Sequence, residues 1–385
     1  MKKQTFIPFY QRFHFLLALI IVIGVVPACS HKSSMQGSQA QAGAGNVFSR
    51  DYIKKKMLLV TDWQLKNPLH GPTDWTNGAF YAGVVAAYKT TRSRVILDSL
   101  MALGVRTEWK PGKRYDHADD IAISQTYIDL YRLKKDQNMI KATIDTVQKM
   151  RTVPGAEIRK NGITWWWCDA LFMAPPTLIK LGVDLKDPSY FALNDKLFKE
   201  TYDLLYNKQA HLFARDATYL VNAQGEGKHE ANGQLVFWSR GNGWVMGGLV
   251  RILEEMPADY ANRAFYVGIY QEMAEKILSL QQADGLWRAS LLDPASYPGG
   301  EGSGSGFYCY ALAWGINKGI LSKDKYLSAV RKSWEGLNTL VSPEGRVGWV
   351  QPIGADPKRN FSAESWEVYG AGAYLLAGSE VIKLK

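Results

Sequence analysis

Apolar residues recur at helical spacing along most of the chain. From about residue 47 onward they fall at positions i, i+3 and i+4, and alternating runs typical of strands are few. The pattern predicts twelve helices, at 47–66, 75–90, 92–104, 119–134, 136–151, 169–182, 188–206, 241–255, 259–282, 303–319, 323–341 and 364–382. Breaks such as Asn67-Pro68 and Pro154-Gly155 separate them. Between 209 and 238, the segments 213–221 and 234–238 flank a glycine-rich turn and predict a short strand or hairpin.

Every second predicted helix follows a short polar segment rich in Gly or Trp. These segments are 74–78, 117–120, 165–169, 238–244, 300–305 and 362–366. The other helices begin after plainer turns. Six helical hairpins with this asymmetry predict an all-α fold, an (α/α)6 barrel in which the N-termini of the inner helices converge at one end. The alternative is that the Asp, Ser and Asn residues in these segments only cap their helices.

The N-terminal segment has the pattern of an export signal. Lys2, Lys3 and Arg12 precede an apolar run over 13–26, which is too short to span a bilayer as a helix. The run ends in Val26-Pro27-Ala28-Cys29, which resembles a bacterial lipobox.

Three parts of the chain are therefore predicted. They are a lipoprotein signal peptide over 1–28, a flexible tether over 29–46 that begins with a lipid-carrying Cys29, and a catalytic barrel over 47–385. This organisation predicts a lipid-anchored protein in the periplasm or at the cell surface, with the anchor as its only membrane contact. The alternative is an ordinary secretory signal that is cut nearby.

Composition and charge narrow the class of ligand. The chain is 46% hydrophobic and 21% charged, as expected of a globular protein, and 12% of its residues are aromatic. Removal of residues 1–28 deletes three basic and no acidic residues, which lowers the formal charge from +10 to +7. The remaining Lys and Arg form no blocks, so nucleic acid is not expected as a partner. Cys168, Cys309 and the six His residues show no metal-ligand spacing, and we expect no metal.

Asp169 is the first candidate catalytic residue. It follows three consecutive Trp residues and Cys168. Loss of solvation beside indole rings raises the pKa of a carboxyl and favours a proton-donating form. The helix N-terminus has the opposite effect, so the net shift stays open. The alternative is that Asp169 caps its helix and the Trp residues belong to the core.

Asp119 and Asp120 stand side by side at the start of another predicted inner helix. Asp120 continues the apolar phase of Ile123 and Tyr127, because it precedes them by three and seven positions. We therefore predict that Asp120 faces the cavity and forms an acid pair with Asp169, of the kind used in glycosidic chemistry. The alternative is that this position serves only for capping, by Asp119.

Further residues are predicted to bind substrate. Arg240 lies between Trp238 and Trp244, where a guanidinium suits a carboxylate and the indoles offer stacking faces; its alternative role is a salt bridge within the barrel. The remaining candidates are Asp74, Trp167, His211, Glu301, Ser303 and Ser305. The last three are expected to bond sugar hydroxyls, or else to form a flexible solvated loop. His211 and Asp216 flank Phe213 and are expected to contact ligand or to hold a long loop. Neither a nucleotide-binding glycine motif nor GxSxG is present.

Six segments, taken together, resemble glycoside hydrolase family 105, the unsaturated rhamnogalacturonyl hydrolases. They are His-Ala-Asp-Asp-x-Ala-Ile-x-Gln-Thr-Tyr at 117–127, Trp-Cys-Asp-Ala-Leu-Phe-Met-Ala-Pro-Pro at 167–176, Phe-Ala-Arg-Asp-Ala-Thr-Tyr at 213–219, Trp-Ser-Arg-Gly-Asn-Gly-Trp at 238–244, and the segments at 301–305 and 370–377. They occur in order over roughly residues 50–382. Gly302 departs from the Glu-Thr-Ser wording of the family at 301–303.

The resemblance implies an (α/α)6 barrel that removes 4,5-unsaturated uronic acid from the non-reducing end of lyase-generated oligosaccharides, with pectin or rhamnogalacturonan as the expected source. Asp169 matches the general acid/base, which protonates C4 and helps water add at C5; the resulting hemiketal collapses and releases the aglycone. Asp120 matches the second carboxylate. No metal or organic cofactor is implied. Two alternatives remain: a conventional inverting glycosidase on the same barrel, and a non-catalytic glycan-binding lipoprotein.

Overall fold

A computed structural model of the chain describes residues 46–153 and 160–384. The predicted signal peptide over 1–28, Cys29, nearly all of the tether and the Pro154-Gly155 break lie outside the described residues. Within the described part, the structure is almost entirely helical, as predicted, and no helix there is long and apolar enough to cross a membrane.

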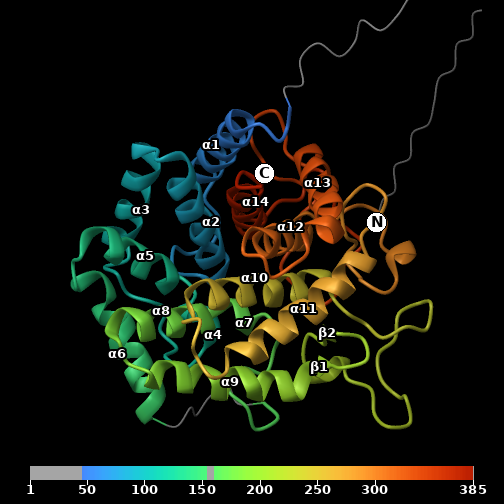
Figure 1. Cartoon of the computed structure of the whole chain (residues 1–385), viewed down its shortest axis with the longest axis horizontal. Helices are drawn as coiled ribbons and strands as arrows, with labels where there is room; N and C mark the ends of the chain where they lie inside the picture. Colours follow the sequence, from blue (N-terminus) through green and yellow to red (C-terminus); the bar gives the residue numbers. More distant parts are fainter. Residues whose placement is uncertain (1–45, 154–159, 385) are drawn as a thin grey trace, which may run out of the picture. The chain divides into compact units, whose positions relative to one another are not determined.

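Six helices form a closed inner ring (Figure 1). In order around the ring they are α2 (Trp75–Thr91), α5 (Ser124–Lys134), α8 (Pro175–Leu185), α10 (Ser239–Glu255), α12 (Gly302–Asn317) and α14 (Val368–Val381). Each packs on the next, and α14 packs back on α2. Six outer helices cover them: α1 (Arg50–Lys66), α3 (Arg94–Arg106), α6 (Asn138–Thr152), α9 (Ser189–Leu205), α11 (Arg263–Ser279) and α13 (Lys323–Thr339). The predicted (α/α)6 barrel is confirmed.

Two of the predicted inner helices are broken near their N-termini. The segment predicted at 119–134 consists of α4 (Ala118–Ile121) followed by α5, and the segment predicted at 169–182 consists of α7 (Ala170–Met173) followed by α8. The second break falls at Pro175 and Pro176, which lack the N–H groups that would continue the α7 ladder. Each short helix therefore sets its own direction, which matters for the carboxylates described below.

The predicted hairpin differs from the structure. Strand β1 (Tyr206–Asn207) pairs with β2 (Leu212–Phe213), and the segment 234–238 forms no ladder beyond isolated bridges. The turn is tight because the Asn207 side chain accepts the backbone N–H groups of Gln209 and Ala210, at 3.0 and 2.8 Å. Beyond β2 the chain forms two 3₁₀ turns, η1 (Ala217–Tyr219) and η2 (Pro294–Ser296), within long loops.

Small residues let the inner helices approach closely. Gly83 of α2 faces Gly372 of α14, and a Cβ on either residue would lie 2.5–2.6 Å from a backbone oxygen of the opposite helix. A side chain larger than hydrogen would therefore force these two helices apart. The ring is closed at this contact between the first and the last inner helix.

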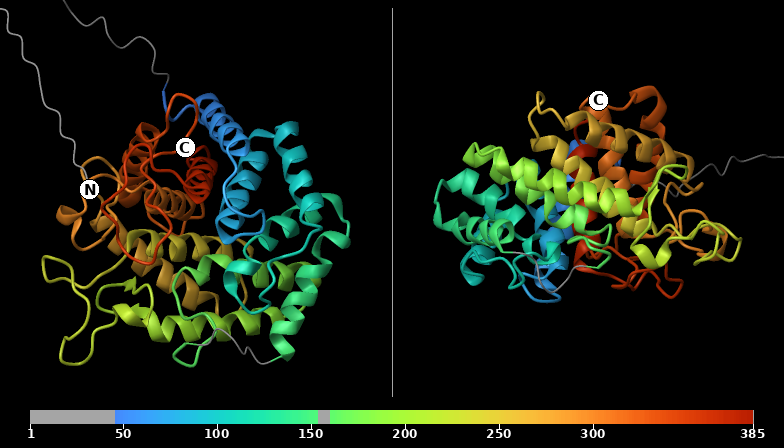
Figure 2. Two further views of the ribbon diagram at one scale, coloured as in Figure 1. Left: turned by 180° about the vertical axis from the view of Figure 1, so that it is seen from behind. Right: turned by 90° about the horizontal axis from the view of Figure 1, so that it is seen from below.

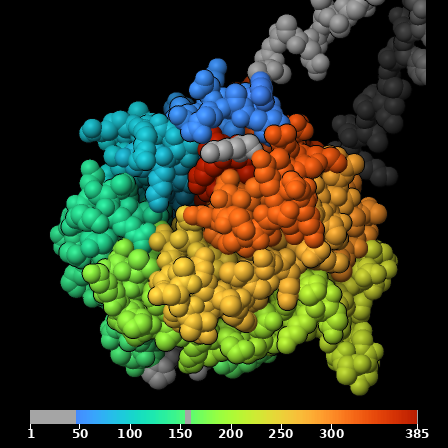
Figure 3. Space-filling view, viewed as in Figure 1, coloured from blue at the N-terminus to red at the C-terminus, as the bar shows by residue number. Residues whose placement is uncertain are grey.

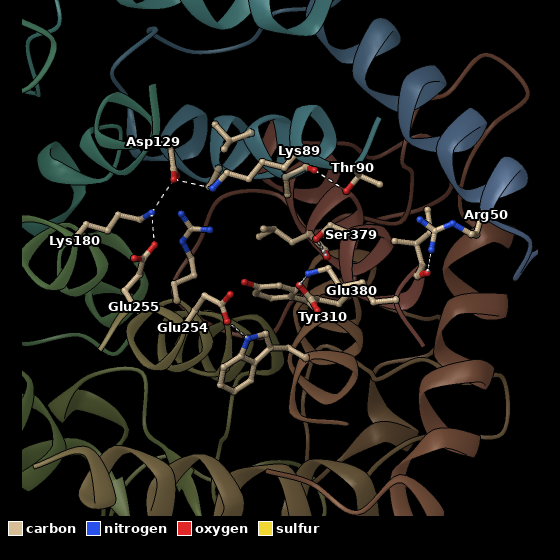
Figure 4. Close-up of a pocket in the computed structure, with 18 residues that line it drawn as sticks. Arg50, Lys89, Thr90, Asp129, Lys180, Glu254, Glu255, Tyr310, Ser379 and Glu380 are labelled. Atoms are coloured by element: carbon tan, nitrogen blue, oxygen red, sulfur yellow. Dashed lines mark hydrogen bonds and ion pairs between the residues drawn. The ribbon is translucent and has the colours of Figure 1, made fainter. Parts of the chain in front are cut away.

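The two ends of the barrel differ in character. The long loops that precede the inner helices gather at one end (Figure 2). At the other end, C-terminal residues of the inner helices line a cavity of about 300 Å³ (Figure 4), and α14 lies recessed between α1 and α13 in the space-filling view (Figure 3).

Buried ion pairs hold the helices together at this cavity. The Lys180 ammonium, 4% exposed, lies 3.0 Å from Asp129 and 2.9 Å from Glu255, while Lys89 reaches Asp129 at 2.9 Å. Burial alone would raise the pKa of the Asp129 carboxyl, but Lys180 and Lys89 outweigh it and hold that pKa well below its ordinary value. Arg132 adds contacts to Glu255 and Asp184. Four inner helices, α2, α5, α8 and α10, are thereby linked by charge.

We predict that Lys180→Met lowers the free energy of unfolding by about 3 kcal/mol, because it leaves buried carboxylates short of a counter-charge. Chemical denaturation measures the change. Lys141→Met is the matched control: Lys141 pairs with Asp145 on the surface, where such pairs contribute less than about 1 kcal/mol. Equal losses in the two variants would contradict the account of this cluster.

Candidate active site

Two carboxyl groups come together where α4 and α7 begin. Asp169 lies directly before α7 and is 8% exposed. Asp119 lies in the first turn of α4, which packs on α7, and its side chain is 20% exposed. Burial, and to a lesser degree repulsion from Asp169, raises the pKa of Asp119 to about 7. Burial also raises the pKa of Asp169. The sequence pattern pointed to an acid pair here, and the structure contains one.

The partner of Asp169 is Asp119 rather than Asp120. Asp120 accepts hydrogen bonds from the backbone N–H of Arg114 at 2.8 Å and from its guanidinium Nε at 2.9 Å, and its carbonyl accepts the N–H of Gly112. It therefore closes the loop that precedes α4. The prediction that Asp120 faces the cavity assumed one continuous helix through Ile123, whereas α4 ends at Ile121. It stays a prediction, and the contact with Arg114 gives Asp120 a structural role.

Two cations and one thiol surround Asp169. The Arg215 Nε lies 3.6 Å from its Oδ2, and the Cys168 Sγ lies 3.5 Å from its Oδ1. Burial is the largest influence on the pKa of Asp169 and raises it, while the positive charges of Arg215 and then Arg240 act in the opposite direction. The net shift, open at the level of the sequence, is upward. Cys168 and Cys309 are both free thiols in the structure.

His117 and Trp167 form one wall beside Asp119. The His117 ring packs against Trp167 with centroids 4.8 Å apart, and its Nδ1 accepts the backbone N–H of Asp119. Burial lowers the pKa of His117 to about 4, so the ring is neutral at neutral pH. Its Nδ1 lies 3.7 Å from the Asp119 carboxylate without forming an ion pair there. Trp167, a predicted binding residue, is 3% exposed and presents little free surface.

Arg240 is fully buried inside the barrel. Its Nη1 and Nη2 donate to the backbone carbonyls of Gln351 and Pro352, and its guanidinium lies between the rings of Trp238 and Tyr369, 4.5 and 4.8 Å from their centroids. The Nε of Arg240 has no hydrogen-bond partner among the described residues, and Nη1 and Nη2 each donate one of their two N–H groups to these carbonyls. The predicted recognition of a ligand carboxylate stays a prediction. The alternative, a salt bridge, is not what holds Arg240; two carbonyl oxygens do.

Glu301, Ser303 and Ser305 are used within the fold. Glu301 is the N-cap of α12: its carboxylate accepts the N–H groups of Ser303 and Gly304 and the hydroxyl of Ser303. The Ser305 hydroxyl accepts the N–H of Trp287 at 2.9 Å. All three predicted binding residues are fully buried, so the structure does not bring them to a sugar hydroxyl, and they form no flexible loop either. Neither the predicted sugar contacts nor the flexible loop describes this segment. Glu301 caps α12, Ser303 bonds Glu301, and Ser305 bonds the backbone of Trp287.

The remaining predicted residues lie at different depths. Asp74 caps α2 by accepting the N–H of Thr76 at 3.0 Å, which is the capping alternative. Trp244 is 1% exposed and packs against Phe307 in the core. His211 lies on the hairpin turn, where its ring contacts Tyr206, and Glu272 of the outer helix α11 lies 3.4 Å away. The structure therefore uses His211 to hold the loop against α11.

Arg215 was missed as a site residue, although it belongs to the segment 213–219 that carries the resemblance. Asp216, next to it, was expected to contact ligand or to hold the long loop. The Arg215 Nη1 donates to Asp216 at 2.7 Å. Burial would raise the pKa of Asp216, yet hydrogen bonds from Thr218 and Arg215 lower it overall. An Arg-Asp dipeptide next to a tight hairpin was the available signal.

The arrangement suits general acid/base catalysis. Two buried carboxyl groups that repel each other resist losing both protons, so one proton stays on the pair near neutral pH. A carboxyl that is protonated at neutral pH can give a proton to substrate, and its ionised neighbour can accept one. Within residues 46–153 and 160–384, no group of three His, Cys, Asp or Glu side chains could hold a metal ion.

Several known proteins are similar to this chain in sequence or in structure. An enzyme of Formosa agariphila called unsaturated 3S-rhamnoglycuronyl hydrolase is 43% identical over 86% of this chain and 91% of its own length. A protein of the same name from Alteromonas sp. (strain LOR) is 33% identical over 80% of this chain and 77% of its own length. A solved structure described as a glycosyl hydrolase family 88 protein from Bacteroides vulgatus has a TM-score of 0.80 at 29% identity, covering 87% of this chain and 100% of that one.

The resemblance to unsaturated rhamnogalacturonyl hydrolases is thereby confirmed at the level of the family. The sequence profile described as Glycosyl Hydrolase Family 88 matches residues 50–385, which is the whole barrel. The chain belongs to Glycosyl Hydrolase Family 88.

Proposed function

We propose that the protein removes 4,5-unsaturated uronic acid from the non-reducing end of oligosaccharides that a polysaccharide lyase has produced. The observation that carries this proposal is the buried pair of Asp169 and Asp119, whose pKa values are both raised, in a chain of this family. An enol ether needs a proton at carbon before water can add, and a carboxyl that is still protonated at neutral pH supplies one. The positive charge of the barrel suits an anionic sugar.

We propose the following role for each carboxyl. Asp169 donates its proton to C4 of the double bond, which leaves positive charge shared between C5 and the ring oxygen. Water adds at C5, and the proton that it loses returns to the carboxylate pair. The hemiketal so formed opens and releases the aglycone with its hydroxyl restored. Burial raises the pKa of Asp169, and repulsion within the pair makes its two protons leave in separate steps. The carboxylate that is ionised stabilises the cationic transition state by its charge.

We predict that Asp169→Asn lowers kcat for loss of the double-bond absorbance by about 1,000-fold or more, and that Asp119→Asn lowers it by about 100-fold. Asp120→Asn is the matched control from the same turn: it can still accept hydrogen bonds from Arg114 and should retain activity within about tenfold. The assay follows ultraviolet absorbance of unsaturated oligouronides.

Each competing function has its own outcome in this assay. Wild-type protein that cleaves saturated but not unsaturated oligosaccharides would indicate an inverting glycosidase. Binding without turnover by the wild type, retained in Asp169→Asn, would indicate a glycan-binding lipoprotein. A larger loss in Asp120→Asn than in Asp119→Asn would contradict the assignment of the second carboxylate.

For the source of the substrate, we propose an unsaturated uronic acid linked to 3-sulfated rhamnose. Two relatives that are 43% and 33% identical to this chain carry the name unsaturated 3S-rhamnoglycuronyl hydrolase, whereas a relative named for rhamnogalacturonan is 22% identical. This proposal replaces the pectin source that was expected from the sequence alone. A sulfate group adds a second negative charge to the substrate, and the net positive charge of the chain would attract it.

We predict that kcat/KM for an unsaturated uronyl–rhamnose 3-sulfate exceeds that for its desulfated form by at least about tenfold, the effect of one charge-assisted contact. The same oligosaccharide before and after chemical desulfation provides the matched pair. Equal rates on the two forms, or faster turnover of pectin-derived substrates, would overturn the proposed source while leaving the reaction itself intact.

We also propose that the mature protein is lipid-anchored through Cys29. Support comes from the apolar run over 13–26, the small residues before Cys29 and the Ser, Gln, Ala and Gly residues that follow as a tether. Labelled palmitate should enter the wild-type chain in bacterial cells, and Cys29→Ser should abolish the label and release soluble, active enzyme. Unchanged membrane association in Cys29→Ser would show that an ordinary signal or another contact is used.

A further inference from the structure

One guanidinium, that of Arg215, lies between two carboxylates. Its Nη1 donates to the Asp216 Oδ2 at 2.7 Å, and its Nε lies 3.6 Å from the Asp169 Oδ2. The contact to Asp169 is too long for a hydrogen bond, and the buried Nε has no partner among the described residues. Asp216 therefore holds the hydrogen bond to this cation, while Asp169 feels mainly its charge.

The position of Arg215 is fixed from both sides. The Asp216 Oδ1 accepts the backbone N–H of Thr218 at 2.8 Å and also its hydroxyl, so the carboxylate cannot turn freely. The backbone N–H of Cys168 donates to the Arg215 carbonyl at 2.9 Å, and Trp167 and Asp216 form a backbone bridge. The segment that carries the Arg215–Asp216 pair is thus joined to the residues immediately before Asp169.

Among the charged groups near Asp169, Arg215 is the one whose distance from Asp169 a second carboxylate controls. The groups that act on Asp169 are Arg215, Arg240, Cys168 and Asp216, and Asp119 is coupled to it by repulsion. Arg240 is held by two backbone carbonyls. Arg215 is different, because one carboxylate competes with another for it. A guanidinium released by Asp216 could pair closely with Asp169 and keep that carboxyl ionised.

We propose that Asp216 is a positioning residue that acts through Arg215. It holds the Arg215 guanidinium near Asp169 but too far away to form a hydrogen bond with it. At this distance the guanidinium does not pair with Asp169 before proton transfer, yet its charge stabilises the Asp169 carboxylate afterwards. Nothing in this role requires either residue to touch the substrate. The inference rests on the proposed function, because it concerns the proton that Asp169 delivers. It explains why an Arg–Asp pair that is largely shielded from solvent lies beside the catalytic carboxyl.

The pH dependence of kcat/KM tests this pair. Asp169 is active when protonated, so activity falls as pH rises through its pKa. In Asp216→Asn the freed guanidinium pairs with Asp169 and lowers that pKa, and the basic limb moves to lower pH. In Arg215→Gln the positive charge is lost, the pKa rises and the basic limb moves to higher pH. An Asp beside an Arg shifts by about 1–3 pH units, so we expect the two limbs to differ by at least about one unit.

A double variant separates action through Arg215 from direct action. The negative charge of Asp216 also raises the pKa of Asp169 by itself. If Asp216 acts through Arg215, Asp216→Asn shifts the limb in the wild-type background but by much less in the Arg215→Gln background. An equal shift in both backgrounds overturns the proposal, as does loss of activity in either single variant with no movement of the limb. Arg215→Lys keeps the positive charge, so its basic limb should lie close to that of the wild type and well below that of Arg215→Gln.

Controls keep folding and the proposed function apart from this inference. Asp187 accepts the N–H of Ser189 much as Asp216 accepts that of Thr218, but its side chain is 42% exposed at the start of α9; Asp187→Asn should leave the limb unchanged. If Asp216→Asn does not fold, as judged by thermal melting, Thr218→Ala should shift the limb in the same direction by less. An inactive wild type would refute the proposed function, whereas an active wild type with unmoved limbs in every folded variant would refute only the positioning role.

Discussion

The repulsion between two buried carboxyl groups is the constraint on which the site depends. Burial disfavours the charge of both Asp119 and Asp169, and the charge of Asp169 further disfavours that of Asp119. The energetic consequence is a proton that the pair keeps at neutral pH. Any fold that hosts this pair must bring two chain segments together at a fixed distance and must supply enough positive charge to permit one ionised carboxyl. The barrel does both.

Closure of the inner ring fixes the distance between the carboxyls. Asp119 and Asp169 stand at the N-termini of short helices that precede α5 and α8, so their separation follows from the packing of adjacent inner helices. The glycine contact between α2 and α14 completes the ring, and the ion pairs of Lys180 link inner helices at the opposite end. The end that holds the acid pair is therefore positioned by packing and ion pairs elsewhere in the barrel. Arg215 and Arg240 then supply the positive charge.

The sequence predicted the architecture well because apolar spacing within a helix is a local property. Twelve helical segments and their alternation could be read from neighbouring residues. The break at Pro175 and Pro176 was not predicted, although these prolines were a local signal for it. Orientation within a segment was harder: the choice of Asp120 rested on a helical phase that stops at Ile121. A pattern cannot show where one helix gives way to another when no proline or glycine marks the break.

Long-range partners account for the other differences in the site. Arg240 was expected to bind a ligand carboxylate, but its partners are carbonyl oxygens more than a hundred residues further along the chain. Glu301 and Ser303 form a local contact, in which the Ser303 hydroxyl donates to the Glu301 carboxylate. The many glycines of this segment suggested a flexible loop instead. The Arg215 contact with Asp169 depends on a bridge that joins two separate segments. None of these contacts has a periodic signature, so structure was needed to find them.

The central claim is that Asp119 and Asp169 share one proton near neutral pH, and carboxyl titration tests it most directly. Carbon-13 NMR of protein labelled at aspartate carboxyls, with resonances assigned by Asp119→Asn and Asp169→Asn, reports the charge of each group. The account predicts that one carboxyl of the pair titrates near pH 7 and that this step falls to lower pH when the other residue is replaced by Asn. Two carboxyls that titrate independently near pH 4, each unaffected by replacement of the other, would contradict it.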